Sequence, residues 1–158
     1  MTREEPRGAI RVLVVDDSPT VRERIAEVLC GQPDLVICGE AKNGVEAVAM
    51  AGRLSPDMIV MDVVMPDMDG ITATREIMAE HPTAILINTA HTEYRAANVV
   101  FEALKAGALD VVAKPLAMDD PESEAWEEEL VHKVRVLARH AQIPGRANRN
   151  IEPKNGMG

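Results

Sequence analysis

Acidic residues end two apolar segments of this chain, and a lysine ends a later one. The acids are Asp16 and Asp17 after the first segment and Asp62 after the second, and the lysine is Lys114. A carboxylate at the carboxyl end of a buried strand lies where open α/β sheets place their ligand chemistry. Carboxylates held within a few ångströms repel one another, so they share protons, meet a cation or pair with a base. The pattern therefore predicts one site where three acids and one base converge.

A hard divalent ion with oxygen ligands suits such a site. Mg2+ accepts one or two carboxylates, a carbonyl and several waters. We expect Asp17 and Asp62 to bind the metal directly, with the backbone carbonyl of Val64 as a third protein ligand. Asp16 is expected to act through water.

A carboxylate beside Mg2+ can attack a phosphoryl group in line, because positioning and charge neutralisation supply most of the catalysis. Thr89, at the end of a further apolar segment, can donate a hydroxyl hydrogen bond to one phosphoryl oxygen, and Lys114 can pair with another. Taken alone, Asp62 reads as a cap or turn residue, Thr89 as a strand-end hydroxyl and Lys114 as a surface ion pair. Their joint occurrence at strand ends favours phosphoryl chemistry.

Short apolar runs alternate with amphipathic segments and predict five strand–helix units. The expected strands cover 11–15, 35–38, 56–61, 84–88 and 110–113. The expected helices start at Pro19 behind a Ser18 cap, at Gly44 behind Asn43, at Gly70, before Val100 and at about Pro121, the last one ending at His140. Such units form an α/β, flavodoxin-like, doubly wound five-stranded parallel sheet with five helices, most commonly in the order 2-1-3-4-5. In that order the strands that end in Asp16 and Asp62 are neighbours.

The composition indicates one globular domain. The 158 residues are 46% apolar and 27% charged, and the net charge of −9 argues against nucleic acid or an anionic membrane as the partner. No apolar run approaches the ~18 residues of a membrane span, and the first residues lack the apolar stretch of a signal peptide, so we expect a cytoplasmic protein. We expect an N-terminal extension at 1–9, a domain at 10–141 and a flexible tail or linker at 142–158. Cys30 and Cys38 are expected to be reduced residues in or near the core.

The candidate residues, in order along the chain, resemble the receiver domain of two-component response regulators. The resemblance covers about residues 10 to 140 and includes the Asp16-Asp17-Ser18 run, Asp62 with the segment 65–70, Thr89-Ala90 and Lys114-Pro115. It implies a phosphoacceptor signalling domain with limited self-phosphorylation and self-dephosphorylation, rather than an enzyme. A sensor histidine kinase would donate the phosphoryl group to Asp62 in a Mg2+-dependent transfer, Thr89 and Lys114 would sense it, and a downstream protein or domain would give the output. It also implies a cis peptide at Lys114-Pro115.

Within the family, the segments 65–70 and 101–115 are most similar to the receiver of chemotaxis methylesterases. No Gly-x-Ser-x-Gly nucleophile motif occurs in the chain, so we expect the methylesterase catalytic domain to be absent. Many receivers carry a mobile aromatic residue three positions before the lysine, where this chain has Val111. Tyr94, in the segment after Thr89, is a candidate substitute for that ring.

Several alternatives stay open at this point. The chain could be a stand-alone receiver or the regulatory half of a truncated methylesterase. A Mg2+-dependent phosphohydrolase would use the same acids, although no insertion between the strand–helix units is long enough for a substrate cap. A flavodoxin-like flavin or nucleotide binder would need a Gly/Ser/Thr-rich phosphate loop in place of Asp16-Asp17. The last two helices are a candidate homodimer face.

Overall fold

The computed structural model describes residues 8–94 and 98–141. Its elements in chain order are β1 (Ile10–Val15), α1 (Pro19–Cys30), β2 (Leu35–Ala41), α2 (Gly44–Leu54), β3 (Met58–Met61), α3 (Gly70–Glu80), β4 (Ala84–Ala90), α4 (His91–Tyr94), α5 (Val99–Ala106), β5 (Asp110–Lys114) and α6 (Ser123–His140). The predicted five strands and five main helices are confirmed, and α4 adds a single turn before α5. The predicted extension, apart from Gly8 and Ala9, and the tail at 142–158 lie outside the described residues, and the domain bounds stay a prediction.

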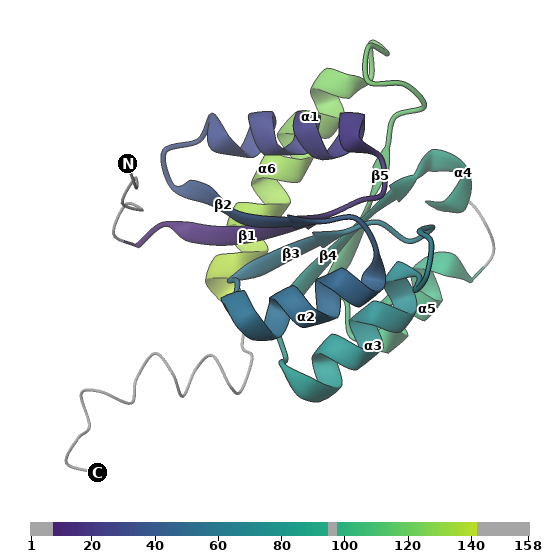
Figure 1. Ribbon diagram of the computed structural model, residues 1–158. Helices are drawn as coiled ribbons and strands as arrows, with labels where there is room; N and C mark the ends of the chain where they lie inside the picture. The colour runs from purple at the N-terminus through teal and green to yellow at the C-terminus, as the bar shows by residue number, and fades with distance from the viewer. Residues whose placement is uncertain (1–7, 95–97, 142–158) are drawn as a thin grey trace.

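The sheet is parallel and has the predicted order β2-β1-β3-β4-β5. Helices α1 and α6 cover one face, while α2, α3 and α5 cover the other (Figure 1). The crossover from β2 past β1 to β3 makes β1 and β3 neighbours at the centre of the sheet. Their carboxyl ends therefore form the crevice in which such sheets bind ligands.

Two apolar cores lie on the two faces of the sheet. In β1, Leu13 and Val15 pack towards α2 and α3, whereas Val12 and Val14 pack towards α1 and α6. All four residues are almost completely buried. A parallel strand covered on both faces has no exposed side, which explains why these strands appear as continuous apolar runs in the sequence.

Side-chain caps begin three of the helices at the expected residues. Ser18 accepts a hydrogen bond from the backbone of the first turn of α1 at 3.2 Å, and Asn43 does the same for α2 at 2.8 Å. Asp69 caps α3 at 2.9 Å. These caps fix the turn that follows each of β1, β2 and β3 at the carboxyl edge of the sheet, because they satisfy amide groups that the helix leaves unpaired.

The edge strand β2 contains a bulge. Ile37 pairs with Val12 and Gly39 pairs with Leu13, so Cys38 has no partner position in β1. Cys38 is partly buried, as expected, but Cys30 is exposed at the end of α1, and the prediction of a near-core position is wrong for it. Both cysteines are free thiols. In the described part of the chain, no helix combines the length and the apolar character that crossing a bilayer requires.

Candidate functional site

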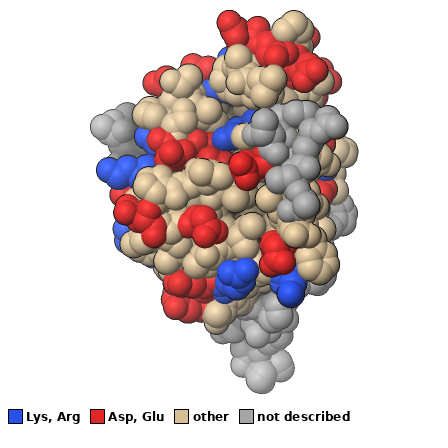
Figure 2. Space-filling view, turned by 90° about the vertical axis from the view of Figure 1, so that its right-hand side faces the viewer, with Lys and Arg blue, Asp and Glu red and all other residues tan. Residues whose placement is uncertain are grey.

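The structure brings the three predicted acids together at the carboxyl edge of the sheet. Carboxylate oxygens of Asp16, Asp17 and Asp62 all lie within 4.8 Å of one another. Asp16 and Asp62 are buried, and Asp17 is exposed. Figure 2 looks onto this edge of the molecule and shows several separate groups of acidic side chains on a largely uncharged surface.

Lys114, at the end of β5, reaches into the same cluster. Its Nζ lies 2.8 Å from Oδ2 of Asp16 and 3.4 Å from Oδ1 of Asp62. Three carboxylates therefore face one ammonium group, and the cluster keeps an excess of negative charge. Oxygen ligands with this charge fit a hard divalent cation such as Mg2+.

The pKa of Asp62 is raised from 3.8 to about 6, mainly because the carboxyl is buried. The neighbouring Asp16 contributes to this rise, while Lys114 and the hydrogen bond from the Val63 amide oppose it. Asp62 is therefore ionised at neutral pH, but it is held in a place that penalises its charge. Binding of a cation, or formation of a covalent bond to a carboxylate oxygen, would remove the cost of burying this negative charge and is therefore favoured at Asp62.

The turn after β1 fixes the side chain of Asp16. Its Oδ1 accepts a hydrogen bond from the Ser18 amide at 2.9 Å, and its Oδ2 accepts one from Lys114. Arg22 donates to the Asp16 carbonyl at 2.8 Å and pairs with Glu40 at the end of β2. Both carboxylate oxygens of Asp16 thus accept hydrogen bonds within the protein. This favours the predicted contact of Asp16 with Mg2+ through a water molecule over direct ligation.

The loop between β3 and α3 carries Val64, whose side chain is 57% exposed. The role of its carbonyl as a ligand stays a prediction. The loop is anchored because the Gly44 amide donates to the Met68 carbonyl at 3.0 Å and the Gly70 amide donates to the Val63 carbonyl at 2.8 Å. These contacts tie the loop to the first residues of α2 and α3.

Thr89 lies at the end of β4, beside Ala113 of β5 and one residue before the position opposite Lys114. It is fully buried, and its hydroxyl has no hydrogen-bond partner among the described residues. Leaving a buried donor unpaired costs about 1–3 kcal/mol. A hydroxyl of this kind, at the edge that carries the acids, is available to a ligand oxygen.

Asn88 was not among the residues singled out from the sequence. It is buried on β4, its Oδ1 accepts a hydrogen bond of 2.8 Å from Nε1 of Trp126, and its Nδ2 has no partner within the described chain. The signal in the sequence is an amide side chain directly after the apolar run 84–87 and within the predicted strand 84–88. Trp126 itself is buried on α6 and packs in the core on that face of the sheet.

Val111 stands where many receivers have a mobile aromatic ring, and it is buried, at 4% exposure. Tyr94, the candidate substitute for that ring, is 40% exposed, and its role in switching stays a prediction. No peptide bond in the described segments is cis, and the expected cis bond at Lys114-Pro115 is therefore wrong.

Comparison with known proteins decides the family. The model of the response regulator receiver domain matches residues 12–123. The chain belongs to this family. The solved response regulator domain of Thermotoga maritima CheB is 39% identical to this receiver, with a TM-score of 0.77 over 85% of this chain and 99% of that one. The predicted resemblance to methylesterase receivers is thereby confirmed.

Curated relatives of this receiver are much longer proteins. A protein-glutamate methylesterase/protein-glutamine glutaminase of Methanospirillum hungatei is 41% identical over 145 residues, which are 92% of this chain and 41% of that protein. A protein of the same name from Shewanella frigidimarina is 52% identical over 106 residues, which are 67% of this chain and 26% of that protein. The receiver thus spans well under half the length of either relative.

Proposed function

We propose that this receiver accepts a phosphoryl group on Asp62 and reports it to a partner through a change of conformation. The observation that carries the proposal is the placement of Asp62, a buried carboxylate with a raised pKa, in one cluster with Lys114 and two further acids. The Thr89 hydroxyl, which has no partner in the described segments, lies at the same sheet edge. Phosphorylation adds charge and strong acceptor oxygens, which these donors can meet.

The phosphoryl donor would be a phosphohistidine of a sensor kinase. One carboxylate oxygen of Asp62 forms a bond to phosphorus while the bond between phosphorus and the histidine nitrogen breaks. The nitrogen keeps the electron pair and takes up a proton. Lys114 would exchange part of its contact with Asp16 for a phosphoryl oxygen, and Thr89 would donate its hydroxyl hydrogen to another.

Asp17 and Asp62, with the Val64 carbonyl, would hold Mg2+, and Asp16 would act on it through water. When bound, this ion neutralises charge on the phosphoryl oxygens. The fit rests on the all-oxygen donor set and on its excess of negative charge over Lys114. The limited self-phosphorylation and self-dephosphorylation expected of such a domain would use the same residues.

A methylesterase catalytic unit is the output partner that the comparisons favour. The relatives are methylesterases, and the receiver of T. maritima CheB has the same fold at 39% identity. We infer that phosphorylation of this receiver controls such a unit in the cytoplasm, whether it lies on the same polypeptide or on another. A homodimer through α5 and α6 stays a prediction.

Incubation with acetyl phosphate and MgCl2 tests the proposal. Intact-mass spectrometry should show one added phosphoryl group on the wild type and none on Asp62→Asn or in excess EDTA. Asp69→Asn is the matched control, because it removes the same charge from an exposed cap in the neighbouring loop and should be labelled normally. Labelling of Asp62→Asn at the wild-type yield would contradict the proposal, and release of phosphate over many turnovers would favour a phosphohydrolase.

A further inference from the structure

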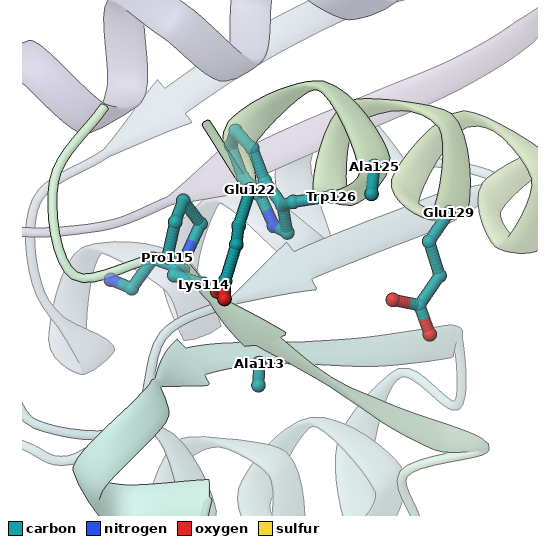
Figure 3. Close-up of a pocket in the computed structure, with 7 residues that line it drawn as sticks. All are labelled: Ala113, Lys114, Pro115, Glu122, Ala125, Trp126 and Glu129. Atoms are coloured by element: carbon teal, nitrogen blue, oxygen red, sulfur yellow. The ribbon is translucent and has the colours of Figure 1, made fainter. Parts of the chain in front are cut away.

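Trp126 connects α6 with the carboxyl ends of two strands. Its indole donates to Asn88 at the end of β4, and its ring lines a cavity of about 270 Å3 together with Lys114 and Pro115 at the end of β5. Figure 3 shows the indole extending from α6 towards the segment Lys114–Pro115. One side chain of α6 thus contacts β4 and shares a cavity with the end of β5, the two strands that carry the donors to the proposed phosphoryl group.

The hydrogen bond between Asn88 and Trp126 has only one possible polarity. An indole nitrogen can only donate, so the carbonyl oxygen of the Asn88 amide must face it, and Nδ2 must face away. That Nδ2 is buried without a partner in the described chain. The Asn88 Nδ2 therefore lacks a hydrogen bond within the described residues at the contact between β4 and α6. A small shift of either element can change which hydrogen bonds Asn88 makes there.

Asn88 and Thr89 are consecutive in β4, and each has a buried donor without a partner among the residues that the structure describes. If Thr89 shifts together with its backbone to bring the hydroxyl to a phosphoryl oxygen, the adjacent Asn88 shifts with it. Hydrogen bonds weaken once the heavy atoms separate beyond about 3.2 Å. Since the Asn88–Trp126 bond is 2.8 Å long, a displacement of less than an ångström is enough to weaken it.

Val111 offers no ring that could move between an exposed and a buried position. We propose that the Asn88–Trp126 pair replaces the mobile ring as the element that responds to phosphorylation. Phosphorylation at the sheet edge would then reposition Trp126 and the first turns of α6. Asn88 is then a positioning residue that acts through Trp126, and the cavity beside Lys114 and Pro115 gives the indole room to move. This inference rests on the proposed phosphorylation of Asp62.

The chain contains a single tryptophan, so its fluorescence reports on Trp126 alone. Wild-type protein treated with acetyl phosphate and MgCl2 should gain one phosphoryl mass and show a changed emission maximum or intensity. Asn88→Leu should gain the same mass but lose the emission change, because leucine fills the site without accepting from the indole. Asn88→Asp keeps an acceptor at this position and should retain the response.

The two measurements separate the possible failures. A phosphoryl mass without an emission change in the wild type would overturn this inference and leave the proposed function intact. An undiminished emission change in Asn88→Leu would also overturn it. Absence of the phosphoryl mass in the wild type would overturn the proposed function and this inference with it.

Hydrogen exchange on the wild type provides a test that needs no folded variant. Amide exchange at 126–130 should change on phosphorylation, whereas α2, on the opposite face of the sheet, should show a smaller change. If Asn88→Leu does not fold, equal changes in α2 and α6, or none in α6, would overturn the inference.

Discussion

Replacing Asp62 by asparagine should stabilise the protein when no divalent ion is present. Burial and Asp16 together outweigh Lys114 and raise the pKa of Asp62 from 3.8 to about 6. One pKa unit corresponds to about 1.4 kcal/mol, so ionised Asp62 lowers the free energy of unfolding by roughly 3 kcal/mol at most. Asparagine removes this charge at nearly the same volume, and Lys114 keeps its 2.8 Å contact with Asp16.

The pH dependence has a definite sign. The folded state binds the proton of Asp62 more tightly than the unfolded state, so ionisation of this group destabilises the fold as the pH rises from 3.8 to about 6. Below 3.8 the group is protonated in both states, and the variant should have no advantage from this source. Above about 6 the advantage should be complete.

Urea unfolding in EDTA, at neutral pH and at a pH below 3.8, measures the effect. Asp69→Asn is again the matched control: its asparagine can still cap α3, and it should change the free energy of unfolding little. An Asp62→Asn protein no more stable than wild type at neutral pH would refute the reasoning, and so would an equal gain in Asp69→Asn. Added MgCl2 should stabilise the wild type more than Asp62→Asn, because binding to the folded state adds to its stability.

Two further predictions concern the contribution of Gly70 and Asp34 to the stability of the fold. Gly70→Ala should lower the free energy of unfolding by roughly 1–3 kcal/mol, because a Cβ on Gly70 would overlap the carbonyl oxygen of Asp62. Gly31→Ala has ordinary contacts and should stay within about 1 kcal/mol of wild type in the same urea titration. Hydrogen bonding to Arg135 lowers the pKa of Asp34, so Asp34→Asn should destabilise at neutral pH by on the order of 1 kcal/mol. Thermal melts should show that this difference disappears as the pH falls below 3.8 and through the lowered pKa; a difference independent of pH would contradict this account.

Most of the fold could be predicted because its strands are buried on both faces. Residues 12–15 and 58–61 form short runs with almost no exposed side chain, and such runs are typical of parallel strands that are covered on both faces. The full length of β2 could not be predicted in this way. Its middle residues are partly buried and Glu40 is exposed, so the run loses its apolar character before the strand ends at Ala41.

The acids and the lysine of the site could be predicted because each directly follows or ends a strand. Their positions along the chain fix their edge of the sheet, and the order of the strands fixes their neighbours. The partner of Asn88 could not be found from the sequence, because Trp126 lies 38 residues further along the chain. Only the packing of α6 on the sheet shows that these two polar atoms meet.

The bulge at Cys38 affects how copies of this chain can associate. A flat edge strand with unpaired backbone groups is a template for pairing with another chain, and it promotes aggregation and domain swapping. The bulge twists β2, and the exposed Glu40 adds a charge close to the same stretch of the edge. Extension of the sheet into a second molecule is therefore disfavoured at β2.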